Sequence, residues 1–70
     1  MEITNEQRAQ RALLAVAQYP DNDPDDLSSS ITDLVADLLH LAYQYGIEPD
    51  YVTHTAQMHY QAEAEEEAGL

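Results

Sequence analysis

One run of apolar residues limits the possible folds of this chain more than any other feature. The run, here called the leucine seam, advances by four, three, four, three and four residues and comprises Leu27, Ile31, Leu34, Leu38, Leu41 and Tyr45. These steps place all its members on one face of an α-helix, because an α-helix turns once in about 3.6 residues. Most of the stability of such a helix comes from packing its apolar face on a neighbour. The seam therefore predicts a helix packed against other helices.

A first helix is predicted over residues 5–19. Thr4 stands three residues ahead of Gln7, which is the spacing of a capping box at a helix N-terminus. Pro20 ends the helix, because a proline disfavours helical geometry at the residue before it. The apolar positions of this segment are mostly alanine, so the helix buries little area per turn and depends on its neighbours for order.

The second helix, which carries the leucine seam, is predicted over residues 24–45. Asp23 can serve as its N-cap and Pro24 as its first helical residue. The first turn then carries two acids that the helix dipole favours, Asp25 and Asp26. Ser30 with Asp33 offers a second possible capping start, so two N-terminal boundaries stay open.

A third helix follows after a short turn. Gly46 supplies the left-handed position that ends the second helix, and Ile47 can fold back on its last turn as in a Schellman motif. Pro49 suits the first position of the third helix, which is predicted over residues 49–66. Three consecutive glutamates oppose the helix dipole near its C-terminus, so residues 63–70 are expected to fray.

The predicted fold is all-α, a small three-helix bundle that forms one domain over residues 1–70. The short connection favours antiparallel packing of the second and third helices, with the first helix laid across the pair. A chain of 70 residues without Phe or Trp has few large side chains for a core, which leaves a homodimer open. Leu39 and Tyr43 lie on another side of the second helix from the seam. We expect them to contact the first helix, with a second copy as the alternative.

The charge of the chain is strongly one-sided. Fourteen acids stand against two bases, Arg8 and Arg11, and the formal net charge is −12. Direct binding to nucleic acid or to an anionic membrane is not expected, because those surfaces are themselves negative. A basic partner protein is the natural complement. High acidity also favours solubility and occurs in halophilic proteins, and both of these explanations stay open.

A row of carboxylates follows one face of the second helix. At about 100° per residue, Asp26, Asp33 and Asp37 fall within about 40° of one another, away from the leucine seam. The side chains of Asp33 and Asp37 are expected about 5 to 6 Å apart, comparable to neighbouring phosphates on one nucleic-acid strand. No lysine or arginine follows three or four residues later to neutralise these acids. We take as candidate partner-binding residues this row, other acids of the helices and helix starts, and three tyrosines for apolar contact: Asp25, Asp26, Asp33, Asp37, Tyr43, Glu48, Asp50, Tyr51, Tyr60 and Glu63.

Patterns for catalysis and for metal binding are incomplete. The serines of residues 28–30 stand at a helix start and are suited to capping, and two glycines make no phosphate-binding loop. Residues 21–25 open like a calcium-binding loop, but Asp26 and Thr32 occupy the positions of its turn glycine and its bidentate glutamate. Two acid–histidine pairs lack the further inward-facing acids of a dinuclear site: Asp37 with His40, and His59 with Glu63. We therefore expect no enzyme, no cofactor and no metal site.

The sequence shows no targeting or membrane segment. The first residues lack the basic stretch and apolar run of a secretory signal. No segment approaches the roughly eighteen uninterrupted apolar residues of a transmembrane helix. We expect a cytoplasmic protein, located in the host cytoplasm if a phage encodes it.

Part of the sequence resembles a pattern seen in short, acidic, all-helical proteins of phages and mobile elements. The resemblance covers about residues 31–63 and rests on the stretch 33–40, on Gly46 and Ile47, and on Ala56 with His59 and Tyr60. Some small acidic proteins from that setting are anti-CRISPR or anti-restriction inhibitors that mimic DNA. The resemblance implies a host-directed inhibitor of a basic nucleic-acid channel. It supplies no residue list, so the carboxylates named above rest on helix geometry.

Two functions are compatible with these features. The first is an acidic inhibitor that mimics nucleic acid and blocks a basic DNA- or RNA-binding protein, such as a CRISPR effector or another host defence complex. The second is a small protein–protein interaction module, open to homodimerisation, in which Leu39 and Tyr43 recognise the partner and the acids serve solubility or halophilic adaptation. A metal-dependent enzyme subunit has the least support.

Overall fold

Three helices make up most of the computed structural model, which describes residues 3–69. α1 spans Asn5–Gln18, α2 spans Leu27–Gln44 and α3 spans Pro49–Glu67, and this part of the chain contains no strand. The prediction of an all-α fold with three helices is confirmed, and α2 and α3 pack most closely. None of these helices is long and apolar enough to cross a membrane.

Local signals set both ends of α1. Thr4 Oγ1 accepts a hydrogen bond from Gln7 N (3.1 Å), and Gln7 Oε1 accepts one from Thr4 N (2.9 Å), so both halves of the capping box form. The helix ends at Gln18, and Tyr19 is its extended C-cap directly before Pro20. The capping box and the proline stop were therefore predicted correctly.

The start of α2 lies three residues later than Pro24, so the predicted boundary was wrong. Asp26 is the N-cap, and its Oδ1 accepts a hydrogen bond from Ser29 N at 3.0 Å. Asp23 bends the chain instead, because its carboxylate accepts a hydrogen bond from Asp25 N two residues on, at 3.0 Å. Asp25 and Asp26 therefore precede the helix, and the prediction that they are first-turn acids is corrected.

Ser30 fixes the preceding loop to α2. Its hydroxyl accepts a hydrogen bond from Asp23 N at 2.7 Å and donates to Asp26 O at 3.1 Å. Ser30 is buried, and these bonds satisfy its polar atom. The alternative helix start at Ser30 was also wrong, because this side chain anchors the loop from inside the first turn.

The turn from α2 to α3 has the predicted form. Gly46 has a φ of 73°, in the left-handed region. Ile47 N donates to Ala42 O (2.8 Å) and Gly46 N donates to Tyr43 O (3.1 Å), which are the two hydrogen bonds of a Schellman motif. α3 then begins at Pro49, where the missing amide donor costs nothing.

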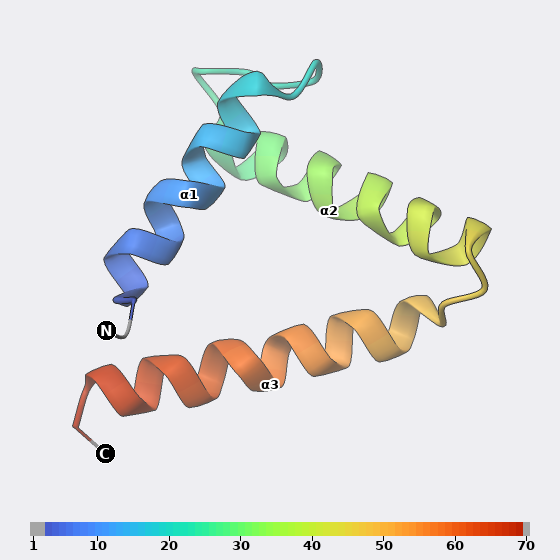
Figure 1. The fold of residues 1–70 in the computed structure, drawn as a ribbon. Coiled ribbons are helices and arrows are strands. Elements are labelled where there is room, and N and C mark those ends of the chain that lie inside the picture. Colours follow the sequence, from blue (N-terminus) through green and yellow to red (C-terminus); the bar gives the residue numbers. More distant parts are fainter. Residues whose placement is uncertain (1–2, 70) are drawn as a thin grey trace.

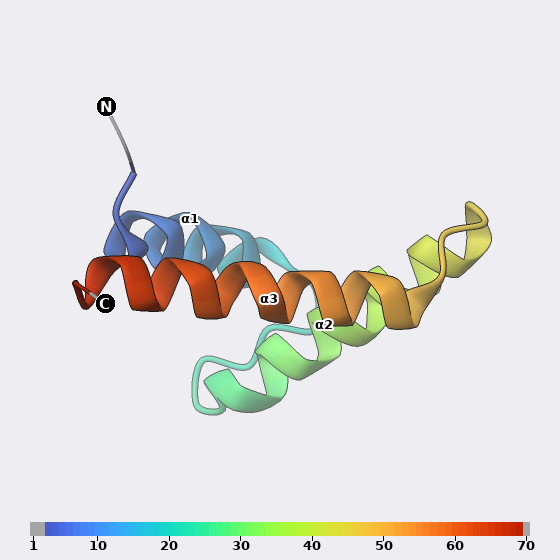
Figure 2. The same cartoon turned by 90° about the horizontal axis from the view of Figure 1, so that it is seen from below.

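The three helices lie along the sides of an open triangle (Figures 1 and 2). The two ends of the described chain lie side by side in both views, because the start of α1 is bonded to the end of α3. Asn5 N donates a hydrogen bond to Glu67 Oε2 (2.6 Å), and the Asn5 side chain donates to Glu63 O (3.0 Å). A carboxylate at a helix N-terminus is favoured by the helix dipole. The fraying of residues 63–70 stays a prediction, and Leu70 lies outside the described residues.

Little apolar surface is buried within this triangle. Among residues 3–69, the buried side chains are Val16, Ala42 and Ser30, and most of the leucine seam is roughly half-exposed. The chain exposes 5934 Å², whereas a compact monomer of its mass exposes about 4,400 Å². Its radius of gyration is 13.7 Å, against about 11 Å for a compact domain of this length. The seam was expected to fill a core, but one chain does not enclose it.

Candidate protein-binding surfaces

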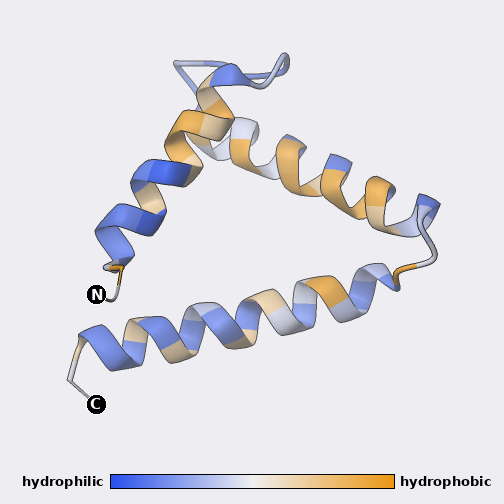
Figure 3. Cartoon of the chain, viewed as in Figure 1, coloured by the Kyte–Doolittle hydropathy of each residue, from blue (hydrophilic) through white to orange (hydrophobic). Residues whose placement is uncertain are grey.

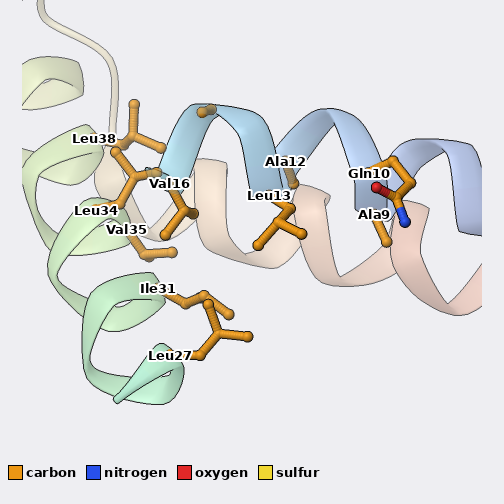
Figure 4. A pocket seen from close by; sticks show the side chains of 11 residues that line it. Ala9, Gln10, Ala12, Leu13, Val16, Leu27, Ile31, Leu34, Val35 and Leu38 are labelled. Carbon is orange, nitrogen blue, oxygen red and sulfur yellow. The ribbon is translucent and has the colours of Figure 1, made fainter. Parts of the chain in front are cut away.

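An apolar groove lies where α1 and α2 meet. It has a volume of about 510 Å³, and its lining residues are Ala9, Gln10, Ala12, Leu13, Ala15, Val16, Leu27, Ile31, Leu34, Val35 and Leu38. We call this surface the α1–α2 groove. In Figure 4, Val16 points towards Leu34 and Leu38, which closes the groove at one end, while Leu27 and Ile31 extend into the space beside Leu13.

The groove contains the most hydrophobic part of the molecule. Figure 3 shows apolar residues concentrated in the C-terminal half of α1 and along α2, whereas α3 is mainly hydrophilic. Gln10 is the single polar residue in the lining, and no acid or base belongs to it. An exposed apolar surface of this kind is typical of a site that another protein covers.

The acid row lies on another face of α2. Asp33 and Asp37 are exposed, and they are one helical turn apart in a regular part of the helix. Asp26 stands just before the helix, where its carboxylate is the N-cap. Helical periodicity places the row about 110° around α2 from the centre of the leucine seam. A partner on the acid row and a partner in the groove would therefore approach from different directions.

A contact between α1 and α2 holds one member of the acid row. The Tyr19 hydroxyl, at the C-terminal end of α1, donates a hydrogen bond to Asp37 Oδ2. The sequence analysis missed Tyr19, because no local pattern indicates that a residue before a proline reaches another helix. The contact leaves Asp37 exposed, so its charge remains accessible to a partner.

The other candidate acids differ in their surroundings. Asp25 is exposed in the loop before α2, Glu48 is the N-cap of α3 and forms no side-chain cap bond, and Asp50 is exposed in the first turn of α3. Glu63 is partly covered, and its Oε2 lies 3.4 Å from Arg8 Nε. This is the one ion pair in the described part of the chain. Glu63 therefore connects α3 to α1, a role that the sequence did not indicate.

The three candidate tyrosines do not form one surface. Tyr43, Tyr51 and Tyr60 are all well exposed, and Tyr43 is 74% exposed. Tyr51 and Tyr60 are nine residues apart on α3, so they project about 180° apart around the helix. The exposure of Tyr43 also shows that its expected packing on the first helix was wrong. The structure thus aligns the acid row but distributes the other candidate residues over several faces.

Further comparisons give no additional assignment. No three His, Asp or Glu side chains lie together as metal ligands within residues 3–69. No family model, no curated protein and no solved structure matches this chain. The argument for function therefore rests on the two surfaces described above.

Proposed function

We propose that this protein is an acidic inhibitor that occupies the basic nucleic-acid-binding surface of another protein. The observation that carries the proposal is the pair Asp33 and Asp37, exposed on a regular helix one turn apart. The two carboxylates are about 5 to 6 Å apart at that spacing. Among residues 3–69 the one ion pair, Arg8 with Glu63, lies at the opposite corner of the triangle, so no bridge neutralises this pair.

The mechanism follows from the charge and the rigidity of α2. A net charge of −12 attracts a basic protein over a long range and accelerates the encounter. The helix then presents carboxylates whose spacing is already fixed, so little ordering is required on binding. Exposed tyrosines such as Tyr43 add apolar contact around the charges. The resemblance to phage and mobile-element proteins supports a host defence complex of the CRISPR or restriction type as the partner.

The test compares two variants that lose the same amount of charge. Asp33→Asn with Asp37→Asn removes the acid row, and Glu65→Gln with Glu66→Gln removes two exposed acids near the end of α3. Each pair takes the net charge from −12 to −10. The partner is first isolated from host lysate at low salt, and displacement of DNA from that partner is then measured for each variant. We expect the acid-row variant to displace DNA about tenfold less well or worse, because each lost contact to a charged group is worth about 1.5 to 3 kcal/mol.

Salt dependence provides the second measurement. Affinity of the unmodified protein for its partner should fall steeply between about 50 and 500 mM salt, because screening weakens contacts between exposed charges. Equal loss in both variants would show that only total charge matters. A flat salt response, or retained affinity in the acid-row variant, would contradict nucleic-acid mimicry.

A second candidate function is an interaction module that recognises its partner through apolar side chains. The observation in its favour is the exposure of Tyr43 and of the leucine seam. In that case the acids maintain solubility, and the Asp33→Asn and Asp37→Asn variant keeps its affinity. If the acidity is instead a halophilic adaptation, circular dichroism should show the helices only in molar salt.

A further inference from the structure

The open triangle exposes more surface than a protein of this mass needs to expose. The excess over a compact monomer is on the order of 1,000 to 1,500 Å², on a chain that exposes 5934 Å². Two chains that each buried this excess would form an interface of about 2,000 to 3,000 Å². Obligate homodimers typically bury about 2,000 to 5,000 Å². The missing burial therefore has the size of one dimer interface per chain.

The chemistry of the exposed surface favours an identical partner. The α1–α2 groove has no charged lining residue, so nothing in it selects a basic or an acidic segment of another protein. The alternating steps of four and three residues in the leucine seam are those of helices that pack against copies of themselves. Homodimer interfaces are also more apolar than interfaces that form transiently. Each of these observations is independent of the acid row.

We propose that a second copy of this chain covers the α1–α2 groove. In a two-fold arrangement, each copy contributes the same surface, so Ile31 and Leu13 of both chains become buried together. The acid rows lie on other faces of α2 and stay exposed, so the dimer presents the carboxylates twice. A partner with two basic surfaces, or two partner molecules, can then bind one dimer.

The salt response of the dimer is opposite to that of a complex with a basic partner. Two chains of net charge −12 repel each other, and salt screens this repulsion. Dimerisation should therefore strengthen as salt rises from about 50 to 500 mM, whereas inhibition by the acid row should weaken over the same range. Failure of one proposal is thus distinguishable from failure of the other.

Sedimentation equilibrium of the unmodified protein is the first test. We expect a mass of twice 7.9 kDa that dissociates on dilution, together with a thermal midpoint that rises with protein concentration. A mass of 7.9 kDa at every concentration and salt, with full helical signal in circular dichroism, would overturn the proposal. A stable complex with a different protein at the groove, and no self-association, would overturn it as well.

Two substitutions locate the interface. Ile31→Glu places a charge in the groove, where Ile31 is 45% exposed in the single chain. Leu14→Glu makes the matched change on α1 outside the groove, where Leu14 is 65% exposed. We expect Ile31→Glu to weaken dimerisation by about a hundredfold or more, because a symmetric interface carries the charge twice, and Leu14→Glu to change it less than about twofold. Equal effects would place the interface elsewhere, and if Ile31→Glu does not fold, the concentration dependence of the unmodified protein decides.

Discussion

Asp26 belongs to the acid row and is also the N-cap of α2, and substitutions can separate these two roles. Its Oδ1 accepts a hydrogen bond from Ser29 N at 3.0 Å, which satisfies one of the amide groups that a helix start leaves unpaired. Replacing such a cap by alanine costs about 0.5 to 2 kcal/mol, typically about 1. For a domain of this size, a loss of about 1 kcal/mol lowers the midpoint of thermal unfolding by about 4 to 8 °C. We therefore expect Asp26→Ala to lower the thermal midpoint by this amount.

Two further variants serve as controls for the cap. Asp26→Asn removes the charge but keeps an oxygen acceptor, and asparagine caps a helix about as well as aspartate, so its midpoint should stay near that of the unmodified protein. Asp25→Ala removes the neighbouring carboxylate, which is exposed and does not cap the helix, and it should also have little effect. Thermal unfolding followed by circular dichroism at one fixed protein concentration compares all four proteins, because self-association would otherwise shift the midpoint.

The pattern of the three results decides whether this reasoning is correct. If Asp26→Asn is as harmful as Asp26→Ala, the charge at this position stabilises the protein and the hydrogen bond does not. If Asp25→Ala equals Asp26→Ala, the N-cap is not at Asp26. In partner binding, by contrast, Asp26→Asn tests the acid row alone, because the helix start is preserved.

Two other substitutions test the corners of the triangle. Gly46→Ala should lower the free energy of unfolding by about 1 to 2 kcal/mol in urea denaturation, because a side chain disfavours the φ of 73° although nothing lies within 4 Å of the new Cβ. Gly69→Ala, with a φ of 79° beyond the end of α3, is the matched control and should change stability little. Arg8→Gln removes the partly exposed ion pair with Glu63 and should cost less than about 1 kcal/mol at low salt and nearly nothing at high salt. A larger loss that salt does not reduce would mean that Arg8 stabilises α1 in some other way.

The local signals in the sequence were sufficient for most helix ends. The capping box of Thr4 and Gln7, the stop before Pro20 and the Schellman turn at Gly46 all involve hydrogen bonds or steric effects within a few residues of chain. Such signals act in the same way whatever the rest of the molecule does. The start of α2 was missed because Asp23 can cap a helix or bend a loop, and the buried Ser30 seven residues later selects the bend.

The candidate site was predictable only where it depends on helical periodicity. The spacing of Asp33 and Asp37 fixes their common face once α2 forms, and the structure keeps both exposed. The pairing of Glu63 with Arg8 and of Asp37 with Tyr19 was not predictable, because these partners lie on different helices. No pattern in a single sequence records which helices meet at a corner.

The sequence by itself determined that this chain forms three helices, with a leucine seam and an acid row on different faces of the second. Only the tertiary structure decided that the seam stays open to the outside and that the ends of the chain are bonded together. The physical reason is range. Capping and periodicity act over one or two turns, whereas the burial of an apolar face depends on the angles at which whole helices cross, and here those angles leave the α1–α2 groove uncovered.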